Sequence, residues 1–395
     1  MIYAITGAVV LLLVALLVII FFKRSHRRKA QRYSIRNNLI PMGPSNELRA
    51  LRTTIEKMVK ENTEFSPKKQ FEELELNDER RATHQHCKTA LKYTSKVKTR
   101  CLNAFPDVIP YESTRVVLKT KIKGKNYINA SWLNKAEQEG PYAIPTLNPY
   151  IPFSNLNIIT TQNPMSHTKE HYYQMLYENY ITVVVSFCTR QEFGSKELYS
   201  DIEEEINKLK IKLSPGKLIT PFLAQRNVEI HHSGDNSNQN LRIFQFVDWP
   251  DFGLGKKTND CRDKFLSAIS LMRKMIGKDK TTTNMVVQDG NGGVGGAAVF
   301  VVLLKLFQAV DESIDNANPE GELSEDKKMV LNVFETVNCM RKKREKLVHT
   351  FAEYLFMIEC LLDYVKEKPH FDNLSIDDFH ESKSFEDTIY FTVIK

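Results

Sequence analysis

The stretch MVVQDGNGGVGGAAVF, residues 285–300, has the pattern of an anion-binding loop. An apolar run enters it, glycines fill it, and a second apolar run leaves it. Because backbone N–H groups at a helix N-terminus favour anions, this pattern predicts a phosphate-binding loop between a strand and a helix. The same stretch contains no cysteine, serine, histidine, arginine or lysine. It therefore offers neither a nucleophile nor a cation to hold a phosphate group.

The letters GNGGVG, residues 290–295, also match the dinucleotide fingerprint GxGxxG. That fingerprint needs a second strand ending in an acidic residue about 20 residues further on. At that distance the chain reads AVDESIDNANPEGE, a polar segment with no strand before it. We therefore set the nucleotide-binding interpretation aside and expect no cofactor.

The runs around this loop predict an α/β fold. Strand-like runs such as TVVVSF, NVEIHHS, LRIFQFV and NMVV come mostly before helical runs such as DCRDKFLSAISLMRKMI and TFAEYLFMIECLLDYVKE. This order predicts a mixed sheet flanked by helices. The globular pattern covers residues 71–368. A basic and helical juxtamembrane segment, 23–70, precedes it with a polar linker at 62–70, and a flexible C-terminal tail, 369–395, follows it.

The N-terminus predicts a membrane anchor. Ile2–Phe22 is an uncharged apolar run of 21 residues, followed by KRSHRRKAQR with six Lys or Arg and no acid. Such a run spans a hydrocarbon core, and the positive-inside rule places the following residues in the cytoplasm. A cleaved signal peptide would carry its charge before the run instead. We expect residues 2–22 to be a single-pass transmembrane helix, either of a short anchored form or of a longer receptor.

Composition excludes several classes of function. The net charge is +7, but much of the excess lies in the cluster after the apolar run, so nucleic acid is not expected as a partner. That cluster is either a stop-transfer signal alone or also a contact for anionic lipids. The six cysteines show no CxxC and no Cys/His spacing suited to zinc. We therefore expect reduced thiols in the cytosol and no metal site.

Several further motifs carry a family resemblance. They are NAFPDVIPYESTRVVL at 103–118, NYINASWL at 126–133, IITTQNPMSHT at 158–168, FQFVDWPDFG at 244–253, and MRKKREKLVHTFAEYLF at 340–356. Together with the glycine-rich loop, their order and spacing resemble the catalytic domain of receptor-type protein tyrosine phosphatases. The resemblance covers roughly residues 71–368. It implies a twisted mixed sheet with helices on both sides.

The resemblance also implies a mechanism. In the family a cysteine thiolate attacks the phosphorus, while loop amides and an arginine hold the phosphate oxygens. An aspartate on a mobile WPD loop protonates the leaving tyrosine. Trp249, Pro250 and Asp251 match that loop. Asp251 thus stands at the general-acid position, although an acid without a nucleophile has nothing to complete, and we expect it to be vestigial.

The glycine-rich loop departs from the family pattern HCxxGxxR in either of two alignments. Keeping Met285–Val287 in the strand places Asp289 at the nucleophile and Gly295 at the arginine. Sliding by one residue places Gly290 and Gly296 there. We prefer the first alignment because it keeps three apolar residues in a buried strand. It assigns the phosphate-cradling backbone to five loop positions: Gly290, Asn291, Gly292, Gly293 and Val294.

Other family positions are kept unevenly. Phe105 stands where the family stacks a tyrosine on the substrate ring, and Asp107 matches the acid that grips the substrate backbone. Glu353 replaces the glutamine that positions the hydrolytic water and is expected to add negative charge to the pocket. Arg344 matches a residue that supports the catalytic loop. We leave open whether it keeps that role or is a structural surface cation.

Asp289 should repel a phosphate dianion, because its carboxylate points into the cradle. The loop amides could bind this carboxylate themselves, so that the pocket fills itself. The five glycines from Gly290 to Gly296 could instead leave the loop floppy. Asp289 is not expected to be a nucleophile itself, because the second acid of aspartate-based phosphatases is replaced by Asn291.

These observations predict a membrane-anchored, cytoplasmic, catalytically inactive phosphatase-like domain. It would act as a scaffold or regulator of phosphotyrosine signalling, with protein partners such as other phosphatases or phosphotyrosine proteins. One alternative is a weak phosphotyrosine trap. The other is an active protein tyrosine phosphatase, for which Cys188 and Cys261 are the cysteines to test. The sequons at Asn129 and Asn373 offer a test of topology.

Overall fold

The computed structural model describes residues 66–85, 102–133, 156–187, 202–220, 222–234, 237–246, 258–276, 283–315 and 332–375, with Thr53 and Lys57 in addition. No helix within these residues is long and apolar enough to cross a membrane. The expected transmembrane helix at 2–22 lies outside the described residues, as do the WPD loop with Asp251, the end of the tail, and Cys188.

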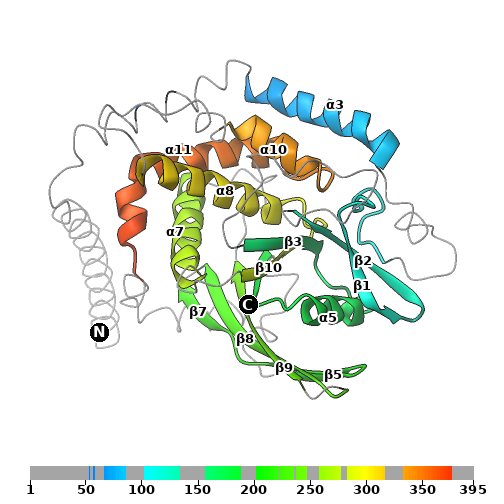
Figure 1. The fold of residues 1–395 in the computed structure, drawn as a ribbon. Coiled ribbons are helices and arrows are strands. Elements are labelled where there is room, and N and C mark those ends of the chain that lie inside the picture. The colour runs from blue at the N-terminus through cyan, green and yellow to red at the C-terminus, as the bar shows by residue number, and fades with distance from the viewer. Residues whose placement is uncertain are drawn as a thin grey trace, which may run out of the picture.

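Within the described residues, ten strands form one mixed sheet in the order β1-β2-β3-β10-β4-β9-β8-β6-β5, with β7 paired to β8 (Figure 1). The strands are β1 Arg115–Ile122, β2 Lys125–Trp132, β3 Leu156–Gln162, β4 Val183–Phe187, β5 Ile202–Ile206, β6 Leu209–Leu213, β7 Lys217–Thr220, β8 Leu223–His232, β9 Ser237–Phe246 and β10 Thr283–Asp289. The predicted mixed sheet is therefore confirmed.

Four neighbouring strands in the middle of the sheet, β3, β10, β4 and β9, run parallel to one another. All five residues of β4 are buried, which explains its uninterrupted apolar run VVVSF. A strand of this kind is covered by helices on both faces. In contrast, β6 alternates between buried and exposed residues, as expected of an antiparallel strand with one wet face.

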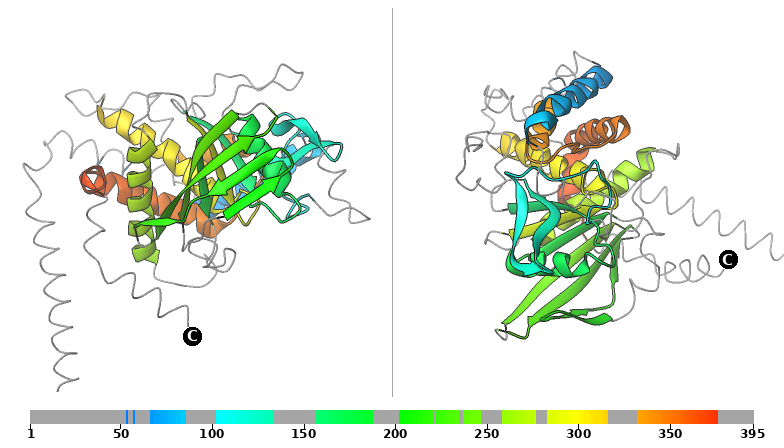
Figure 2. Two further views of the ribbon diagram at one scale, coloured as in Figure 1. Left: turned by 90° about the horizontal axis from the view of Figure 1, so that it is seen from below. Right: turned by 90° about the vertical axis from the view of Figure 1, so that its right-hand side faces the viewer.

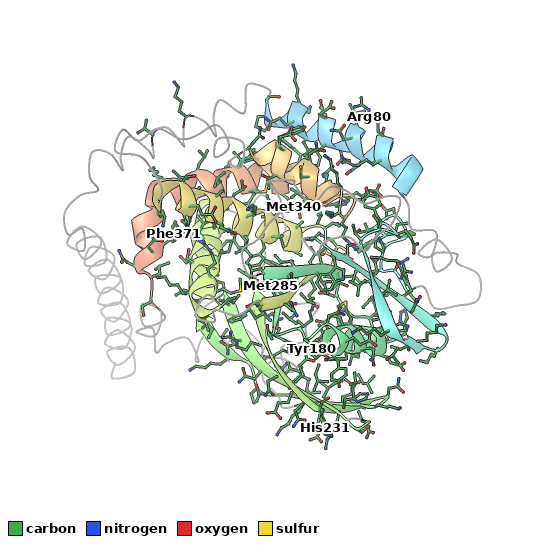
Figure 3. All side chains as sticks on the ribbon, viewed as in Figure 1. Arg80, Tyr180, His231, Met285, Met340 and Phe371 are labelled. Atoms are coloured by element: carbon green, nitrogen blue, oxygen red, sulfur yellow. The ribbon has the colours of Figure 1, made fainter. Side chains whose placement is uncertain are left out.

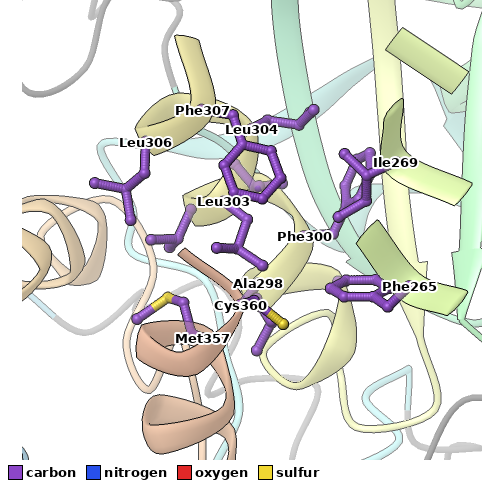
Figure 4. Close-up of a cluster of buried hydrophobic side chains, with 14 of the residues drawn as sticks. Phe265, Ile269, Ala298, Phe300, Leu303, Leu304, Leu306, Phe307, Met357 and Cys360 are labelled. Atoms are coloured by element: carbon purple, nitrogen blue, oxygen red, sulfur yellow. The ribbon is translucent and has the colours of Figure 1, made fainter. Parts of the chain in front are cut away.

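Helices cover both faces of the sheet, as the resemblance implied. They are α3 Pro67–Gln85, α5 Lys169–Glu178, α7 Thr258–Ile276, α8 Gly296–Asp315, α10 Val333–Arg341 and α11 Phe351–Asn373. α5 packs in one core with β1 and β2, whereas α7, α8, α10 and α11 share the larger core on the other face (Figure 2). α8 lies at the centre of that larger core, and its apolar side chains meet Phe265 of α7 and Met357 of α11 (Figure 4).

Two predicted boundaries need correction. The linker predicted at 62–70 ends earlier, because Pro67–Gln70 are the first turn of α3. Proline suits a first helical turn, where its missing N–H costs nothing, so Pro67 begins a helix rather than a linker. The helix α11 passes Lys368 and ends at Asn373, and Phe371 in its last turn is buried (Figure 3).

The first turn of α3 is tied to the domain by a buried hydrogen bond, in which the Tyr354 hydroxyl donates to Gln70 Oε1 over 2.8 Å. Tyr354→Phe should therefore lower the free energy of unfolding by about 1 kcal/mol, the usual net value of such a bond. Denaturant titration of the full chain measures this loss. Tyr180→Phe is the matched control, because Tyr180 is 72% exposed and its loss of a hydroxyl should cost almost nothing. Equal stability of the Tyr354→Phe variant would contradict the inclusion of this turn in the domain.

Candidate functional site: a loop that binds its own carboxylate

The glycine-rich loop joins the end of β10 to the start of α8, at the carboxyl ends of the parallel strands. Asp289 is the last residue of β10, and its carboxylate turns into the loop. Gly293 N–H donates to Asp289 Oδ1 over 2.6 Å, and Gly295 N–H and Ala297 N–H donate to Oδ2 over 2.9 and 3.1 Å. The prediction that the loop amides bind this carboxylate is confirmed, and of the two expected loop states the structure has the self-occupied one.

Two of the glycines are required by the shape of the loop. Gly292 and Gly293 have φ angles of +81° and +79°, in the left-handed region that favours glycine. A Cβ on Gly293 would lie 2.5 Å from the Thr161 carbonyl oxygen, and one on Gly292 would lie 2.7 Å from Val108 Cγ1. Thr160 Oγ1 also donates to the Gly293 carbonyl over 2.5 Å. Gly293 therefore lets the loop pack closely on β3, and Gly292 lets it pack on Val108 in the segment before β1.

Gly295 has a different reason for lacking a side chain. A Cβ at this position would lie 2.9 Å from Glu353 Oε1, 3.1 Å from Asn291 Nδ2 and 3.3 Å from Asp289 Oδ2. Three polar side chains thus converge on the space into which a residue at 295 would project. An arginine here would have to displace the Glu353 carboxyl, so the glycine at 295 and the glutamate at 353 depend on each other.

Both carboxyl groups of this cluster are buried, with Asp289 at 3% and Glu353 at 3% exposure. Burial raises the pKa of Asp289, while the backbone N–H donors of the loop oppose that rise. Burial, with a smaller contribution from the neighbouring Asp289, raises the pKa of Glu353 to about 7. The expected negative charge at Glu353 is therefore present in full only above neutral pH.

Arg344 lies beneath the loop and is fully buried. Its Nη2 donates to the Gly292 carbonyl over 2.5 Å and to Asn129 Oδ1 over 2.8 Å, and its Nη1 donates to Ser131 Oγ over 3.1 Å. Burial lowers the pKa of Arg344 to about 10. Of the two roles left open from the sequence, the surface cation is wrong.

A second buried arginine, Arg341, holds the turn between α10 and α11. This turn positions the start of α11, where Glu353 lies beside the loop. Arg341 donates to the carbonyls of Leu347 and Val348 over 2.9 and 2.8 Å. It also pairs with Glu75 and Asp78 of α3, both over 2.8 Å. Thr350 and Glu353 then form a capping box that begins α11. The position of the Glu353 carboxyl therefore depends on contacts that reach as far as α3.

The sequence matches the model of one protein family over most of this fold. The model described as protein-tyrosine phosphatase matches residues 99–363, about two thirds of the chain. The chain belongs to the protein-tyrosine phosphatase family. The matched range includes the loop between β10 and α8.

Relatives of the chain are receptor-type phosphatases. It is 26% identical over 282 residues to receptor-type tyrosine-protein phosphatase S of Gallus gallus, covering 70% of this chain and 16% of that protein. It is likewise 26% identical to receptor-type tyrosine-protein phosphatase F of Homo sapiens and to tyrosine-protein phosphatase Lar of Drosophila melanogaster, covering 13% and 12% of them. The chain thus spans less than a fifth of the length of these relatives.

The structure brings the segment with Phe105 and Asp107 next to the loop, because the neighbouring Val108 lies against Gly292. Phe105 is exposed, at 40%, and Asn291 of the loop is exposed as well. Asp107 is held by Lys346, whose Nζ donates to Asp107 Oδ2 over 2.9 Å, and this bond lowers the pKa of Asp107. Gly290 is half-buried and Val294 is buried. Asp251 lies outside the described residues.

Two residues to which the sequence assigned no role at the site complete it. Asn129 accepts from Arg344 and donates through Nδ2 to the Val108 carbonyl and to Gln162 Oε1, over 2.9 and 3.0 Å. Thr160 bonds to the loop from β3, as described above. Both lie in motifs that carry the family resemblance, at 126–133 and 158–168. Their polarity at buried strand positions is the further signal that could have marked them in the sequence.

Glu353→Gln should stabilise the domain by about 2–3 kcal/mol at pH 8.5 and hardly at all at pH 4.5. The native pKa of about 7 exceeds the ordinary value of 4.5, so the native state holds a proton that the unfolded state loses. The free energy of unfolding therefore falls as the pH rises from the ordinary pKa to the native pKa, by about 1.4 kcal/mol for each unit of difference between them. Glutamine removes the titration and keeps the capping box.

Chemical denaturation at both pH values measures this effect. Glu72→Gln, on the exposed face of α3, is the matched control and should change stability by less than about 0.5 kcal/mol. A Glu353→Gln variant that is less stable than the parent at pH 8.5 would show that Glu353 is not a buried, destabilised acid.

Proposed function

We propose that this protein is a non-catalytic member of the protein-tyrosine phosphatase family that acts as a scaffold or regulator in phosphotyrosine signalling. The observation that carries the proposal is the bonding of Asp289, whose two carboxylate oxygens accept hydrogen bonds from three backbone N–H groups of the loop and the first turn of α8. A phosphoryl group would need the same donors. The site is therefore filled by a side chain of the chain itself.

The absence of a nucleophile supports the same proposal. In the first alignment Asp289 stands at the nucleophile position, and what favours this alignment is that Met285–Val287 lie in the buried strand β10. Among the cysteines of the described residues, Cys339 and Cys360 are buried and Cys261 lies half-buried on α7. None of these three belongs to the loop. At the arginine position, Gly295 faces the carboxyl of Glu353.

A weak phosphotyrosine trap is the second candidate. Its support is the exposure of Phe105, which could stack on a phosphotyrosine ring, beside Asp107. Such binding would have to displace the Asp289 carboxylate from three hydrogen bonds. It would also approach Glu353, which gains negative charge above neutral pH. The trap is therefore the less favoured of the two.

One experiment separates the scaffold, the trap and an enzyme. The full chain in detergent micelles is mixed with a stoichiometric amount of phosphotyrosyl peptide, and the phosphorus NMR signal is followed for a day. We expect an unmoved signal. A shifted but persistent signal would establish the trap, and a growing signal of free phosphate that Asp251→Ala abolishes would establish an enzyme. The same run with Cys188→Ser and Cys261→Ser variants would then show whether either thiol is the nucleophile.

Membrane anchoring by residues 2–22, with the domain in the cytoplasm, is part of the proposal. Its support is the apolar run with its following basic cluster and the receptor-type names of the relatives. Of the two sequons proposed for testing topology, Asn129 is unsuitable, because it is 1% exposed and bonded on both side-chain atoms. Asn373 is exposed at the end of α11. A glycan on Asn373 in cells would place the domain in the lumen and contradict the cytoplasmic location.

A further inference from the structure

The hairpin of β1 and β2 carries a cluster of lysines at the end of the sheet. Lys119 and Lys121 lie on β1, while Lys123 and Lys125 flank its turn. The first three are exposed and Lys125 is half-buried. The chain has no Asp or Glu from residue 113 to residue 136. The hairpin stands at the opposite end of the domain from α7 (Figures 1 and 2).

Alternation along β1 separates its two faces. Val116, Leu118 and Ile122 are buried in the core shared with α5. The intervening Lys119 and Lys121 therefore point to the other face of the strand. Val117 lies on this outer face too, and it is 42% exposed. The outer face of β1 thus combines positive charge with an exposed aliphatic side chain.

Two acidic residues of α5, Glu178 and Glu170, contact the hairpin but form no ion pair with Lys119 or Lys121. The Glu178 carboxylate accepts hydrogen bonds from Lys119 N–H and Thr120 N–H of β1, each over 2.7 Å. Glu170 pairs with Lys123 over 3.3 Å. Within the described part of the chain, no carboxylate forms an ion pair with the side chains of Lys119 or Lys121.

A second pair of lysines shows what an ordinary solvated strand face looks like in the same sheet. Lys210 and Lys212 of β6 lie directly opposite Glu205 and Glu203 of β5, and Glu229 of β8 is opposite Lys212 on the other side. Lys210 also forms an ion pair with Glu203. Charges on that face are paired across the strands, whereas Lys119 and Lys121 have no acidic partner within the described residues.

We propose that the outer face of β1, together with the lysines at the hairpin turn, is a contact surface for anionic lipid head groups. The inference rests on the membrane anchoring proposed above, which would keep the domain close to the bilayer. A lysine ammonium is a mobile point charge without a directional fork, which suits a diffuse layer of head groups. Each lysine near an anionic leaflet contributes about 1 kcal/mol, and Val117 can enter the interface beside them.

The test uses the full chain reconstituted into lipid nanodiscs, either of phosphatidylcholine alone or with about a third phosphatidylserine. Lysines are labelled with an amine-reactive reagent, and the labelling rates are read by mass spectrometry. In the anionic discs we expect Lys119 and Lys121 to label at least threefold more slowly, and to recover at 0.5 M salt as the surface charge is screened. The rates of Lys210 and Lys212 should not change.

Variants test whether charge is the cause. Lys119→Glu/Lys121→Glu should abolish the lipid-dependent protection of Lys123, while the matched variant Lys210→Glu/Lys212→Glu should leave it intact. Equal labelling in both lipids would overturn the proposal. Labelling of Lys119 and Lys121 that is equally slow in both kinds of disc would be protection independent of lipid charge. It too would overturn the proposal, and it would indicate a protein contact instead.

If the proposed membrane anchoring itself fails, the chain will not migrate with the nanodiscs, and this result is distinguishable from the others. In that case the labelling is repeated with the chain added to anionic or neutral vesicles. Slower labelling of Lys119 and Lys121 on the anionic vesicles alone would support the hairpin contact without the anchor. Equal labelling would overturn it.

Discussion

Asp289→Ala should lower the free energy of unfolding by about 3–5 kcal/mol in phosphate-free buffer. The substitution removes the acceptor of three buried N–H groups, from Gly293, Gly295 and Ala297. Each unsatisfied buried donor costs about 1–3 kcal/mol, and water entering the vacated space recovers part of this. Thermal and urea unfolding of the full chain measure the loss.

The same variant should be stabilised by inorganic phosphate, which should not stabilise the parent. With the carboxylate removed, 10 mM inorganic phosphate at pH 6 should return roughly 1 kcal/mol of stability, the value for a ligand at about five times its Kd. The gain should shrink at pH 8.5, where Glu353 carries negative charge, because its pKa is about 7. Phosphate should not stabilise the parent, in which Asp289 occupies the donors.

Asp263→Ala is the control for Asp289→Ala, since Asp263 is an exposed residue of α7. It should change stability by less than about 0.5 kcal/mol. A gain in stability for Asp289→Ala, in the absence of phosphate, would mean that desolvation of the buried carboxyl outweighs its hydrogen bonds. Equal stabilisation of parent and variant by phosphate would place the anion site elsewhere on the protein.

The self-occupied state of the loop could be predicted from the sequence, because it follows from the types and positions of a few residues. An acid at the end of an apolar strand, followed by glycines and an apolar helix, sets an acceptor among unpaired N–H groups. The protonation state of Glu353 could not be predicted from the sequence. Its raised pKa depends on burial by the start of α11 and on Asp289, and both are tertiary effects.

The ends of the domain were harder to predict for a local reason. Proline is read as a breaker, yet Pro67 occupies a first helical turn. In α11, Glu367 leaves helical geometry at φ −108°, and the helix resumes through Pro369. A kink at the preceding residues makes room for a proline that would otherwise end a helix. Local sequence signals the break, whereas the buried Phe371 shows why the chain continues.

The role of Arg344 was undecided from the sequence because charge alone predicts a surface position. An arginine is seldom fully buried unless its donors are satisfied. Here Gly292, Asn129 and Ser131, from the loop and from β2, supply acceptors for Nη1 and Nη2, whereas Nε has no partner among the described residues. These partners are distant in sequence, so only the fold assembles them. Arg344 is therefore the link between the sheet and the self-occupied loop.

Arg344→Met should consequently cost about 3–5 kcal/mol and loosen the loop. The variant keeps a long apolar stem but leaves the Gly292 carbonyl and Asn129 Oδ1 without the guanidinium, and each lost bond to a charged group is worth about 1.5–3 kcal/mol. Hydrogen exchange of the Gly293 and Gly295 amides should speed up beyond what the global loss of stability explains, because these donors depend on the loop conformation.

Arg344→Lys separates charge from geometry in this interaction. Lysine keeps the positive charge but cannot bond to Gly292, Asn129 and Ser131 at once, so an intermediate loss is expected. If lysine restored full stability, charge next to Asp289 would be the essential contribution. If Arg344→Met left the exchange of the loop amides unchanged, the loop would be held by Asp289 and by the contact of Thr160 with Gly293, without help from the arginine.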